Sequence, residues 1–333
     1  MQTPFVSVMM PAYNAAPYIG EAIESILSQT YANFELIILD DGSTDDTLEI
    51  AKKYATKDSR IRLLENEGNQ GLAFTRNRLL QEVKGAYLAI LDSDDVSLPT
   101  RLEKQVAFLN AHPQVGLLGT AVTTISEKGE PLGQMRFETA PNQIKSLLLF
   151  QNCFAQSAVM LRREFASLGY RSAYPPSEDY DLWVRISRRA KVANLPEPLV
   201  KYRVHAGGIS KRKEEVLQRA SLAIRQWQLE ELGLSVSEKE MALHHKIAYA
   251  EFEISLDFLK DGLHWLEKLK AANREKGIFD IEVFDTLLRE YAQKVIAANL
   301  KLKARALNVA KETSFWSEFP RGLRLRWEVK RVF

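Results

Sequence analysis

The first two hundred residues alternate short β-rich runs with amphipathic helical segments, and this alternation restricts the fold more than any other feature. Four apolar runs have the length and composition of strands: 5–9, 34–39, 61–64 and 86–91. Four segments between or after them carry apolar residues at helical spacing: 17–29, 46–54, 72–83 and 99–111. Strand and helix alternating at these intervals imply right-handed crossovers, and therefore a mainly parallel α/β sheet flanked by helices.

The pattern changes twice further along the chain. After residue 115 it is less regular, with strands expected at 115–124 and 157–161 and helices at 142–150 and 179–190. Beyond residue 210 three long amphipathic segments follow, nearly free of proline and without a convincing strand: 214–231, 237–260 and 281–310. We therefore predict an α/β domain over 1–210 and an all-helical C-terminal domain over 211–333.

Polar clusters follow all four of the first strands. They are Pro11–Asn14, Asp40–Asp45, Asn66–Gly71 and Asp92–Asp95. In a parallel sheet these loops emerge at one edge, the carboxyl end, where open α/β sheets bind their ligands. The coincidence of four such loops predicts a single site at this edge.

The cluster Asp92–Asp95 has three carboxylates within four residues. They repel one another unless a cation lies among them. Oxygen ligands of this kind suit a hard divalent ion such as Mg²⁺ or Mn²⁺. The alternative is a turn and helix cap ahead of Pro99, because aspartate is a favoured capping residue.

Two further acidic groups have both structural and chemical interpretations. Asp40 and Asp41 precede Gly42, which can make a turn, but a carboxylate there can also accept the imide N–H of uracil or thymine. Glu178 and Asp179 begin a predicted helix, where acidic residues are common. Asp179 could equally be a general base, and the sequence leaves its basicity open.

Arg203 and His205 add a cation and an imidazole that suit phosphate oxygens or a metal ion. A lone histidine is more often structural, so this pair by itself is a weak signal.

Taken together, these motifs resemble glycosyltransferase family 2, the inverting nucleotide-sugar transferases with a GT-A fold. The similarity runs from Val6 to about Ser210. It is carried by VSVMMPAYN from Val6, SILSQT from Ser25, FELI from Phe34, DDGSTD from Asp40, NQG from Asn69, AFTRN from Ala73, LDSDD from Leu91, ED at Glu178 and YRVH from Tyr202. The helical domain matches no feature of this family.

The resemblance implies a role for each matching residue. It implies base contacts from Pro11, Tyr13 and Asp41, and ribose or diphosphate contacts from Arg76 and Asp92. Asp94 and Asp95 would hold Mn²⁺ or Mg²⁺, with His205 reaching the metal or the diphosphate. Asp179 would be the general base, and Glu178 and Arg203 would also bind substrate.

These roles imply a metal-dependent transferase that moves a sugar from a UDP- or dTDP-sugar to an acceptor hydroxyl with inversion, in polysaccharide or glycoconjugate synthesis. Two alternatives remain. A sugar-phosphate nucleotidyltransferase also needs paired carboxylates, but Pro11–Asn14 lacks the glycine-rich basic loop such enzymes carry. A non-catalytic nucleotide-sugar binding module is the other, although carboxylates stand at every matching position.

Composition narrows the partners and the compartment. The net charge of +2 argues against a nucleic-acid binder, and the single cysteine, Cys153, excludes a disulfide framework. No apolar run reaches the roughly 18 residues of a spanning helix, and no secretory signal pattern is present. We therefore expect a cytoplasmic protein with a nucleotide-sugar donor and a saccharide or lipid-linked acceptor.

The average charge hides a basic C-terminal tail. Residues 301–333 hold nine Lys and Arg against three Glu, a net charge of +6, so the preceding residues carry −4. Over 319–333 basic residues interleave with Leu, Trp and Phe, which suits peripheral contact with an anionic membrane at its inner face. A solvated terminal helix explains the pattern equally well. The helical domain could also form a homo-oligomer.

Overall fold

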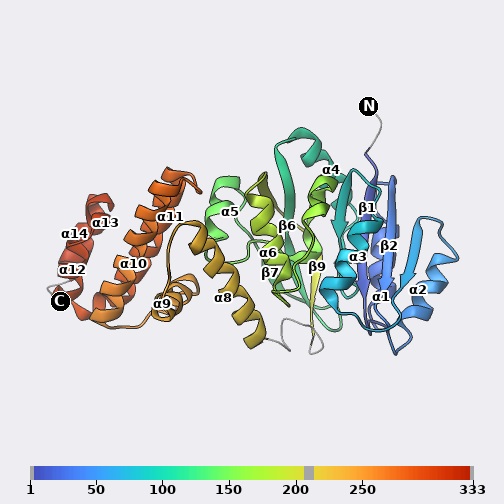
Figure 1. Ribbon diagram of the computed structural model, residues 1–333, viewed down its shortest axis with the longest axis horizontal. Helices are drawn as coiled ribbons and strands as arrows, with labels where there is room; N and C mark the ends of the chain where they lie inside the picture. The colour runs from blue at the N-terminus through green and yellow to red at the C-terminus, as the bar shows by residue number, and fades with distance from the viewer. Residues whose placement is uncertain (1–3, 206–213, 331–333) are drawn as a thin grey trace. The chain divides into compact units, whose positions relative to one another are not determined.

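The computed structural model describes residues 4–205 and 214–330, and the chain divides into two compact units (Figure 1). The first comprises residues 1–144 and 153–221, and the second comprises residues 145–152 and 222–333. The boundary predicted at 210 therefore precedes the observed one. The short segment 145–152 belongs to the helical unit, which the sequence pattern did not indicate.

The first unit is built on a nine-stranded sheet with the order β3-β2-β1-β4-β8-β6-β9-β5, and β7 pairs with β6. Its strands are β1 (Val6–Ala12), β2 (Phe34–Asp40), β3 (Ile61–Glu65), β4 (Tyr87–Ile90), β5 (Val96–Ser97), β6 (Val115–Ser126), β7 (Pro131–Met135), β8 (Met160–Arg162) and β9 (Lys191–Val204). The first four strands are present as predicted, and β1 is parallel to β2 and β4, and β2 to β3. Because β8 is antiparallel to β4 and β6, the sheet is mixed.

Helices flank this sheet. They are α1 (Ile19–Leu27), α2 (Thr47–Ala55), α3 (Leu72–Glu82), α4 (Arg101–Ala111), α5 (Pro141–Leu147) and α6 (Glu178–Ser187). Alternate strand residues such as Val8 and Ile38 join Ile23 of α1 and Val106 of α4 in one buried core. Every residue of β1 and β2 is buried, so both faces of these strands are covered, as their continuous apolar runs predict.

Strand β9 was missed by the sequence analysis because it contains two prolines. A proline cannot donate to a ladder and usually marks an edge or a bulge. The pairing of β6 with β9 shifts register where Thr120 faces Leu195 and Ala121 faces Pro198. The two residues between Leu195 and Pro198 bulge out of the ladder, so the strand continues past them to Val204.

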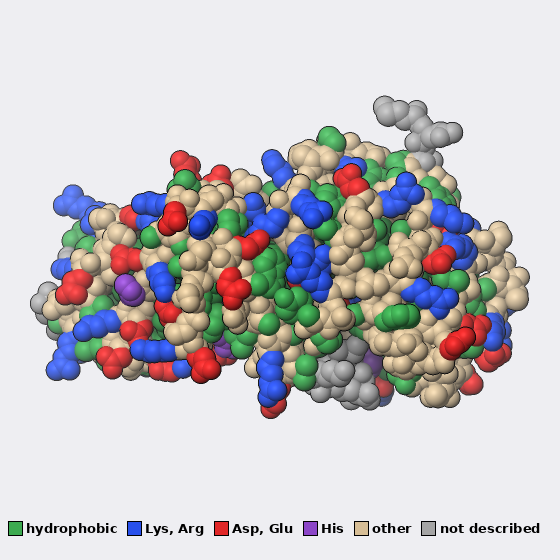
Figure 2. Space-filling model, in the orientation of Figure 1, with side chains coloured by type: hydrophobic (Ala, Val, Ile, Leu, Met, Phe, Trp, Pro, Cys, Tyr) green, Lys and Arg blue, Asp and Glu red, His purple; other side chains and the backbone are tan. Residues whose placement is uncertain are grey.

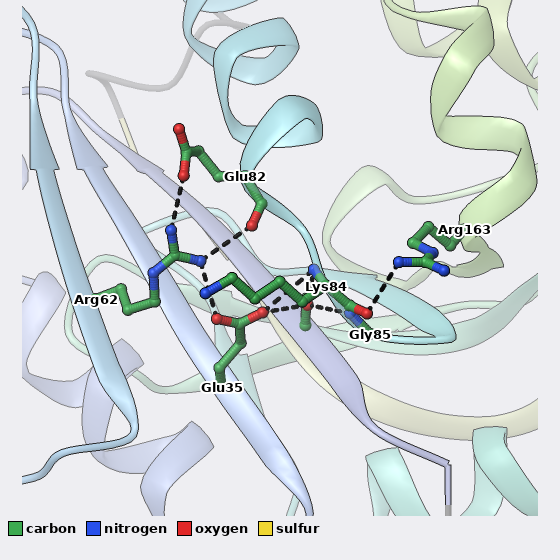
Figure 3. Close-up of polar contacts among 7 residues, drawn as sticks. Glu35, Arg62, Glu82, Lys84, Gly85 and Arg163 are labelled. Carbon is green, nitrogen blue, oxygen red and sulfur yellow. Dashed lines mark hydrogen bonds and ion pairs between the residues drawn. The ribbon is translucent and has the colours of Figure 1, made fainter.

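The amino edge of the sheet is held by a buried polar cluster (Figure 3). Ser7 Oγ donates to Glu35 Oε1 at 2.6 Å, and Arg62 donates to Glu35 Oε2 at 3.0 Å and to Glu82 Oε2 at 2.7 Å. The backbone N–H of Gly85 donates to Ser7 Oγ at 2.8 Å. A Cβ at Gly85 would lie 2.5 Å from the Ser7 nitrogen, so only glycine allows this approach. The cluster fixes the strand starts at the edge opposite the predicted site.

The second unit is helical. Its helices are α8 (Glu214–Glu231, which begins in the first unit), α9 (Glu238–Ala248), α10 (Leu256–Lys276), α11 (Ile281–Asn299), α12 (Ala304–Lys311), α13 (Ser314–Glu318) and α14 (Arg321–Lys330). Leu149 and Phe150 from the inserted segment are part of its apolar core. Among the described residues, no helix is both long and apolar enough to cross a bilayer.

Two of the amphipathic segments predicted here are helical, as expected, but each is divided between two helices. The segment 237–260 divides because Ser255 caps a new helix by accepting the Phe258 N–H at 3.0 Å, and Ala250 before it has a φ of 57°. The segment 281–310 divides at Lys303, whose φ is 53°. Apolar periodicity continues across both breaks, because residues on either side face the same core.

The tail uses two of its aromatic side chains for packing. Phe319 and Trp327 are buried in the core of the helical unit, while Leu325 is half exposed. Acidic side chains lie among the basic ones over the face of this unit that Figure 2 shows. Phe319 and Trp327 are thus used for packing, residues 331–333 lie outside the described residues, and membrane contact stays a prediction.

We predict that the helical unit loses stability in mild acid through His244. This imidazole is fully buried, accepts the Trp265 indole N–H at 3.2 Å and pairs through Nε2 with the Leu149 carbonyl at 3.0 Å. Burial, aided by Arg225, lowers the pKa of His244 from 6.5 to about 3. Since the unfolded state binds the proton first, stability falls as pH drops from 6.5 towards 3, on the order of 2 to 3 kcal/mol by pH 4.

Urea unfolding of the full chain between pH 7 and pH 4 measures this dependence. His244→Gln should flatten it, whereas His264→Gln, which changes an exposed histidine in the same unit, should not. An equally steep dependence in His244→Gln would contradict the assignment.

Candidate active site

The loops after β1, β2 and β4 meet at the carboxyl edge of the sheet, as predicted. In the ladder Ala12 lies beside Asp40, and Met9 lies beside Ile90. Asp41 and Asp92 therefore follow the two strands that flank β1, at the same edge of the sheet. The register of the parallel strands brings together groups that are far apart in the sequence.

The β1 and β2 loops are bonded to each other. The Asn14 N–H donates to Ser43 Oγ at 3.0 Å, and Thr44 N–H donates to Asn14 Oδ1 at 2.9 Å. Asn14 has a φ of 49°, a conformation that asparagine tolerates better than most residues. Pro11 is buried within β1, but Tyr13 is 48% exposed. Of these two predicted base contacts, Tyr13 is the side chain free to stack on a planar group.

Asp41 is buried and organises the loop before α3. Its carboxylate accepts the Asn66 side-chain amide at 2.6 Å, the Gln70 N–H at 2.9 Å and the Gly71 N–H at 3.0 Å. A Cβ on the adjacent Gly42 would lie 2.5 Å from the backbone of this loop, so a residue with a side chain would clash at this position. A carboxylate has about four acceptor positions, so one remains for a further donor.

Arg76 of α3 connects two parts of the site that the sequence places far apart. Its guanidinium donates to Glu178 Oε1 at 2.9 Å and to Asp92 Oδ1 at 3.2 Å, and only 5% of the residue is exposed. Burial alone would lower the pKa of Arg76, but Asp92 and Glu178 raise it above its ordinary value. Arg76 therefore stays charged and holds the start of α6 against the Asp92 loop.

Asp179 occupies the first turn of α6, next to Glu178. Its carboxylate accepts the Tyr180 N–H at 2.7 Å, and the residue is partly exposed. Glu178, by contrast, is 1% exposed and ion-paired with Arg76. The structure thus separates the two neighbours, with Glu178 inside as a support and Asp179 towards solvent.

The three aspartates after β4 lie in different environments. Asp94 is partly exposed, and its Oδ2 lies 2.9 Å from His205 Nε2. Asp95 is 2% exposed and accepts the Arg203 N–H at 2.7 Å. Burial, with Asp94 and Asp92 nearby, raises the pKa of Asp95 well above its ordinary value. Asp94 and His205 therefore come together as predicted, whereas the Asp95 carboxyl is directed into the protein and away from the open edge.

Arg203 is also bonded within the protein. Its side chain is 3% exposed and donates only to the protein: to the carbonyls of Asp94, Ser126 and Glu127 and to the Glu21 carboxylate. These bonds direct the Arg203 guanidinium to protein acceptors, and its contact with a substrate phosphate stays a prediction.

Several supporting residues were not found from the sequence. Ser157 Oγ accepts the Asp92 N–H at 3.1 Å, Tyr170 lies under the Arg76 guanidinium at 5.6 Å, and the Tyr18 ring centroid is 5.0 Å from that of His205. Each lies far from its partner along the chain. The sequence offered only a predicted strand start at Ser157 and no signal for the tyrosines.

The side chains that could ligate a metal ion restrict how such an ion could be held. Within residues 4–205 and 214–330, no group of three or more His, Cys, Asp or Glu side chains is arranged around a common cation position. Asp94 and His205 are the pair in contact. Two protein ligands fit Mg²⁺ or Mn²⁺ in sites that substrate phosphates and water complete, and they do not fit a closed protein cage.

Comparisons with known proteins identify the family of this chain. A family model described as "Glycosyl transferase family 2" matches residues 7–168. The O-antigen biosynthesis glycosyltransferase WbnJ of Escherichia coli is 36% identical over 230 residues, covering 67% of this chain and 88% of that protein. Another Escherichia coli protein, UDP-Glc:alpha-D-GlcNAc-diphosphoundecaprenol beta-1,3-glucosyltransferase WfaP, is 35% identical over 222 residues, with 66% and 85% covered.

Among solved structures, S. aureus TarS residues 1–349 in complex with UDP-GlcNAc superposes with a TM-score of 0.57 at 21% identity, covering 88% of this chain and 89% of that one. The chain spans 54% of the longer TarS structure. At this identity the likeness concerns the fold, which is of the GT-A type. The match with this chain covers most of the length of WbnJ and of WfaP. From these relatives we conclude that the chain belongs to glycosyltransferase family 2 and is a glycosyltransferase.

Proposed function

We propose that this protein is an inverting, metal-dependent glycosyltransferase that moves a sugar from a UDP- or dTDP-sugar to an acceptor hydroxyl. One observation carries the proposal. A single buried guanidinium, that of Arg76, bonds both Asp92 of the polar loop after β4 and Glu178, the residue before Asp179. A donor-side loop and a candidate base are thereby held together in one site.

We assign binding of the donor's nucleobase to the loops after β1 and β2. Tyr13 offers an exposed ring for stacking, and Asp41 keeps one acceptor position that suits the imide N–H of uracil or thymine. Cytosine has no such donor. The names of WfaP and of the TarS complex, which both specify a UDP-sugar, support the same choice.

We assign the cation to Asp94 and His205, with Asp92 beside them and the donor diphosphate completing the coordination. When bound, Mg²⁺ or Mn²⁺ would act as a Lewis acid that stabilises negative charge on the leaving diphosphate. Asp95, which resembles a ligand in sequence, supports the loop from within because its carboxyl is covered.

Asp179 is assigned as the general base. It takes the proton of the acceptor hydroxyl while that oxygen forms a bond to the anomeric carbon, and the bond from this carbon to the diphosphate breaks. Attack from the face opposite the leaving group inverts the configuration. Arg76 and Glu178 hold α6 so that Asp179 faces the site, and no protein nucleophile is needed.

The acceptor belongs to surface polysaccharide or glycoconjugate synthesis, and its class follows from the relatives. WbnJ is named for O-antigen biosynthesis, and WfaP for a diphosphoundecaprenol-linked acceptor. A lipid-linked acceptor would bring the protein to a membrane surface, where the basic tail offers charge but few exposed apolar side chains. Co-sedimentation with anionic vesicles tests that contact, and self-association of the helical unit remains a prediction.

We predict that UDP binds more tightly with Mn²⁺ than without it, and that Asp94→Asn removes most of this difference. Loss of a ligand from a two-residue site should weaken Mn²⁺-dependent UDP binding by about 10-fold or more. Isothermal titration with UDP, with dTDP and with GDP as the comparison nucleotide provides the measurement.

Asp58→Asn, which changes an aspartate paired with Arg60, serves as the matched control. Binding that is indifferent to the base and to the metal would overturn the proposed function. Release of pyrophosphate from UTP and a sugar phosphate would instead indicate a nucleotidyltransferase.

A further inference from the structure

We propose that Arg203 is a positioning residue that holds Asp94 and His205 at the spacing needed for a cation–diphosphate unit, without contacting the donor itself. The inference rests on the proposed function, because it assigns a role within that site. The sequence pattern predicted that the Arg203 guanidinium binds a substrate phosphate, and this inference gives it a supporting role instead.

The bonds of Arg203 direct most of its N–H donors to acceptors of the protein itself. Nε donates to the Asp94 carbonyl at 2.8 Å, Nη1 to the Glu127 carbonyl at 3.0 Å and Nη2 to Glu21 Oε2 at 2.6 Å. The Tyr18 ring covers the guanidinium, with 5.0 Å from its carbon to the ring centroid. A phosphate that displaced these acceptors would break bonds that join parts of the protein.

Arg203 also holds the chain at Asp94 and at the residue that follows it. The Arg203 side chain donates to the Asp94 carbonyl, and the Arg203 backbone N–H donates to the Asp95 carboxylate at 2.7 Å. These two bonds join residues 94 and 95 to residue 203 at two points. His205 follows two residues later, so the spacing between Asp94 and His205 depends on this junction.

Arg203 also ties the junction to two surrounding segments. Glu21 belongs to α1, and Ser126 and Glu127 form the turn between β6 and β7. Tyr18 completes the contact, because its hydroxyl donates to Glu127 at 3.1 Å and its ring lies beside His205. A planar guanidinium can donate in three directions at once, which a lysine ammonium on a flexible stem does less well.

This arrangement has a specific consequence for binding. A residue that only stabilised the fold would affect every ligand of the site alike. A residue that fixes Asp94 and His205 affects ligands that carry both a diphosphate and a metal ion, and it leaves recognition of the nucleoside unchanged. Residues that hydrogen-bond to metal ligands and hold them in place typically contribute 10- to 100-fold in metal affinity.

The experiment compares full-length wild type with Arg203→Gln and Arg203→Lys by isothermal titration. The probes are uridine, UDP alone, and UDP with Mn²⁺, with free Mn²⁺ followed by its electron paramagnetic resonance signal. We expect Arg203→Gln to weaken Mn²⁺–UDP binding at least 10-fold and to change uridine binding less than 2-fold. Arg203→Lys should fall between Arg203→Gln and wild type.

Arg162→Gln is the matched control. Arg162 also donates to several backbone carbonyls, those of Val115, Leu109 and His112, but at the opposite edge of the sheet. We expect its Mn²⁺–UDP affinity to match wild type. If Arg203→Gln does not fold, Glu21→Gln takes its place, because the Glu21 side chain is 54% exposed and the neutral amide removes the ion pair with Arg203.

The outcomes separate the two proposals. A wild type without Mn²⁺-dependent UDP binding would overturn the proposed function, whatever Arg203 does. Mn²⁺-dependent binding that is equally strong in Arg203→Gln, or in Glu21→Gln where that variant is used, would overturn the positioning role alone. Weaker UDP binding in Arg203→Gln without metal, at unchanged uridine affinity, would indicate a direct phosphate contact and also overturn it.

Discussion

Asp179→Asn is expected to lower the rate of sugar transfer by about 10²- to 10⁴-fold while changing UDP-sugar affinity less than about 2-fold. The amide keeps the shape of the side chain and its bond to the Tyr180 N–H, but it cannot accept the proton of the acceptor hydroxyl. Glu178 cannot replace it, because that carboxylate is buried and paired with Arg76. Initial rates of UDP release with saturating donor and acceptor measure the effect.

Asp257→Asn is the matched control for this variant. Asp257 also lies in the first turn of a helix and is exposed, so its replacement tests the effect of losing a helix-terminal charge. We expect wild-type rates from it. Near-normal turnover of Asp179→Asn would reject Asp179 as the base, and a parallel loss of donor binding would indicate a binding role.

Arg76→Met should destabilise the catalytic unit by about 3–5 kcal/mol. It leaves the Glu178 carboxylate buried, and an uncompensated charge in the interior carries a large desolvation cost. Arg76→Met/Glu178→Gln removes that charge and should recover a large part of the loss. Urea unfolding of wild type, both single variants and the double variant completes the cycle.

The comparison between variants decides the interpretation. A loss below about 1 kcal/mol in Arg76→Met, or a double variant no more stable than the single one, would contradict the buried ion pair. Because Arg76 also bonds Asp92, the stabilised double variant should still bind Mn²⁺–UDP less tightly than wild type. Stability and donor binding are therefore separable at this residue.

Much of the first unit could be predicted because local patterns determine it. Strands β1, β2 and β4 are buried along their whole length, so each reads as an apolar run, and a polar loop follows directly at its carboxyl end. Strand β9 could not be predicted in the same way, because the bulge that accommodates its prolines depends on pairing with β6. The breaks at Ala250 and Lys303 likewise depend on packing and not on periodicity.

The sequence by itself determined which chemical groups meet at one edge of the sheet, because parallel strands align their carboxyl ends and the family motifs mark those loops. Only the tertiary structure decided what each group does there. Asp94 and Asp95 are adjacent carboxylates, and so are Glu178 and Asp179. In each pair one carboxylate, that of Asp95 or Glu178, is buried and bonded within the protein, and the other is partly exposed. Arg203 looks like a phosphate ligand in sequence but donates to carbonyls of distant segments. Burial and hydrogen bonding depend on residues more than a hundred positions away, so local sequence cannot separate a supporting residue from one that meets the substrate.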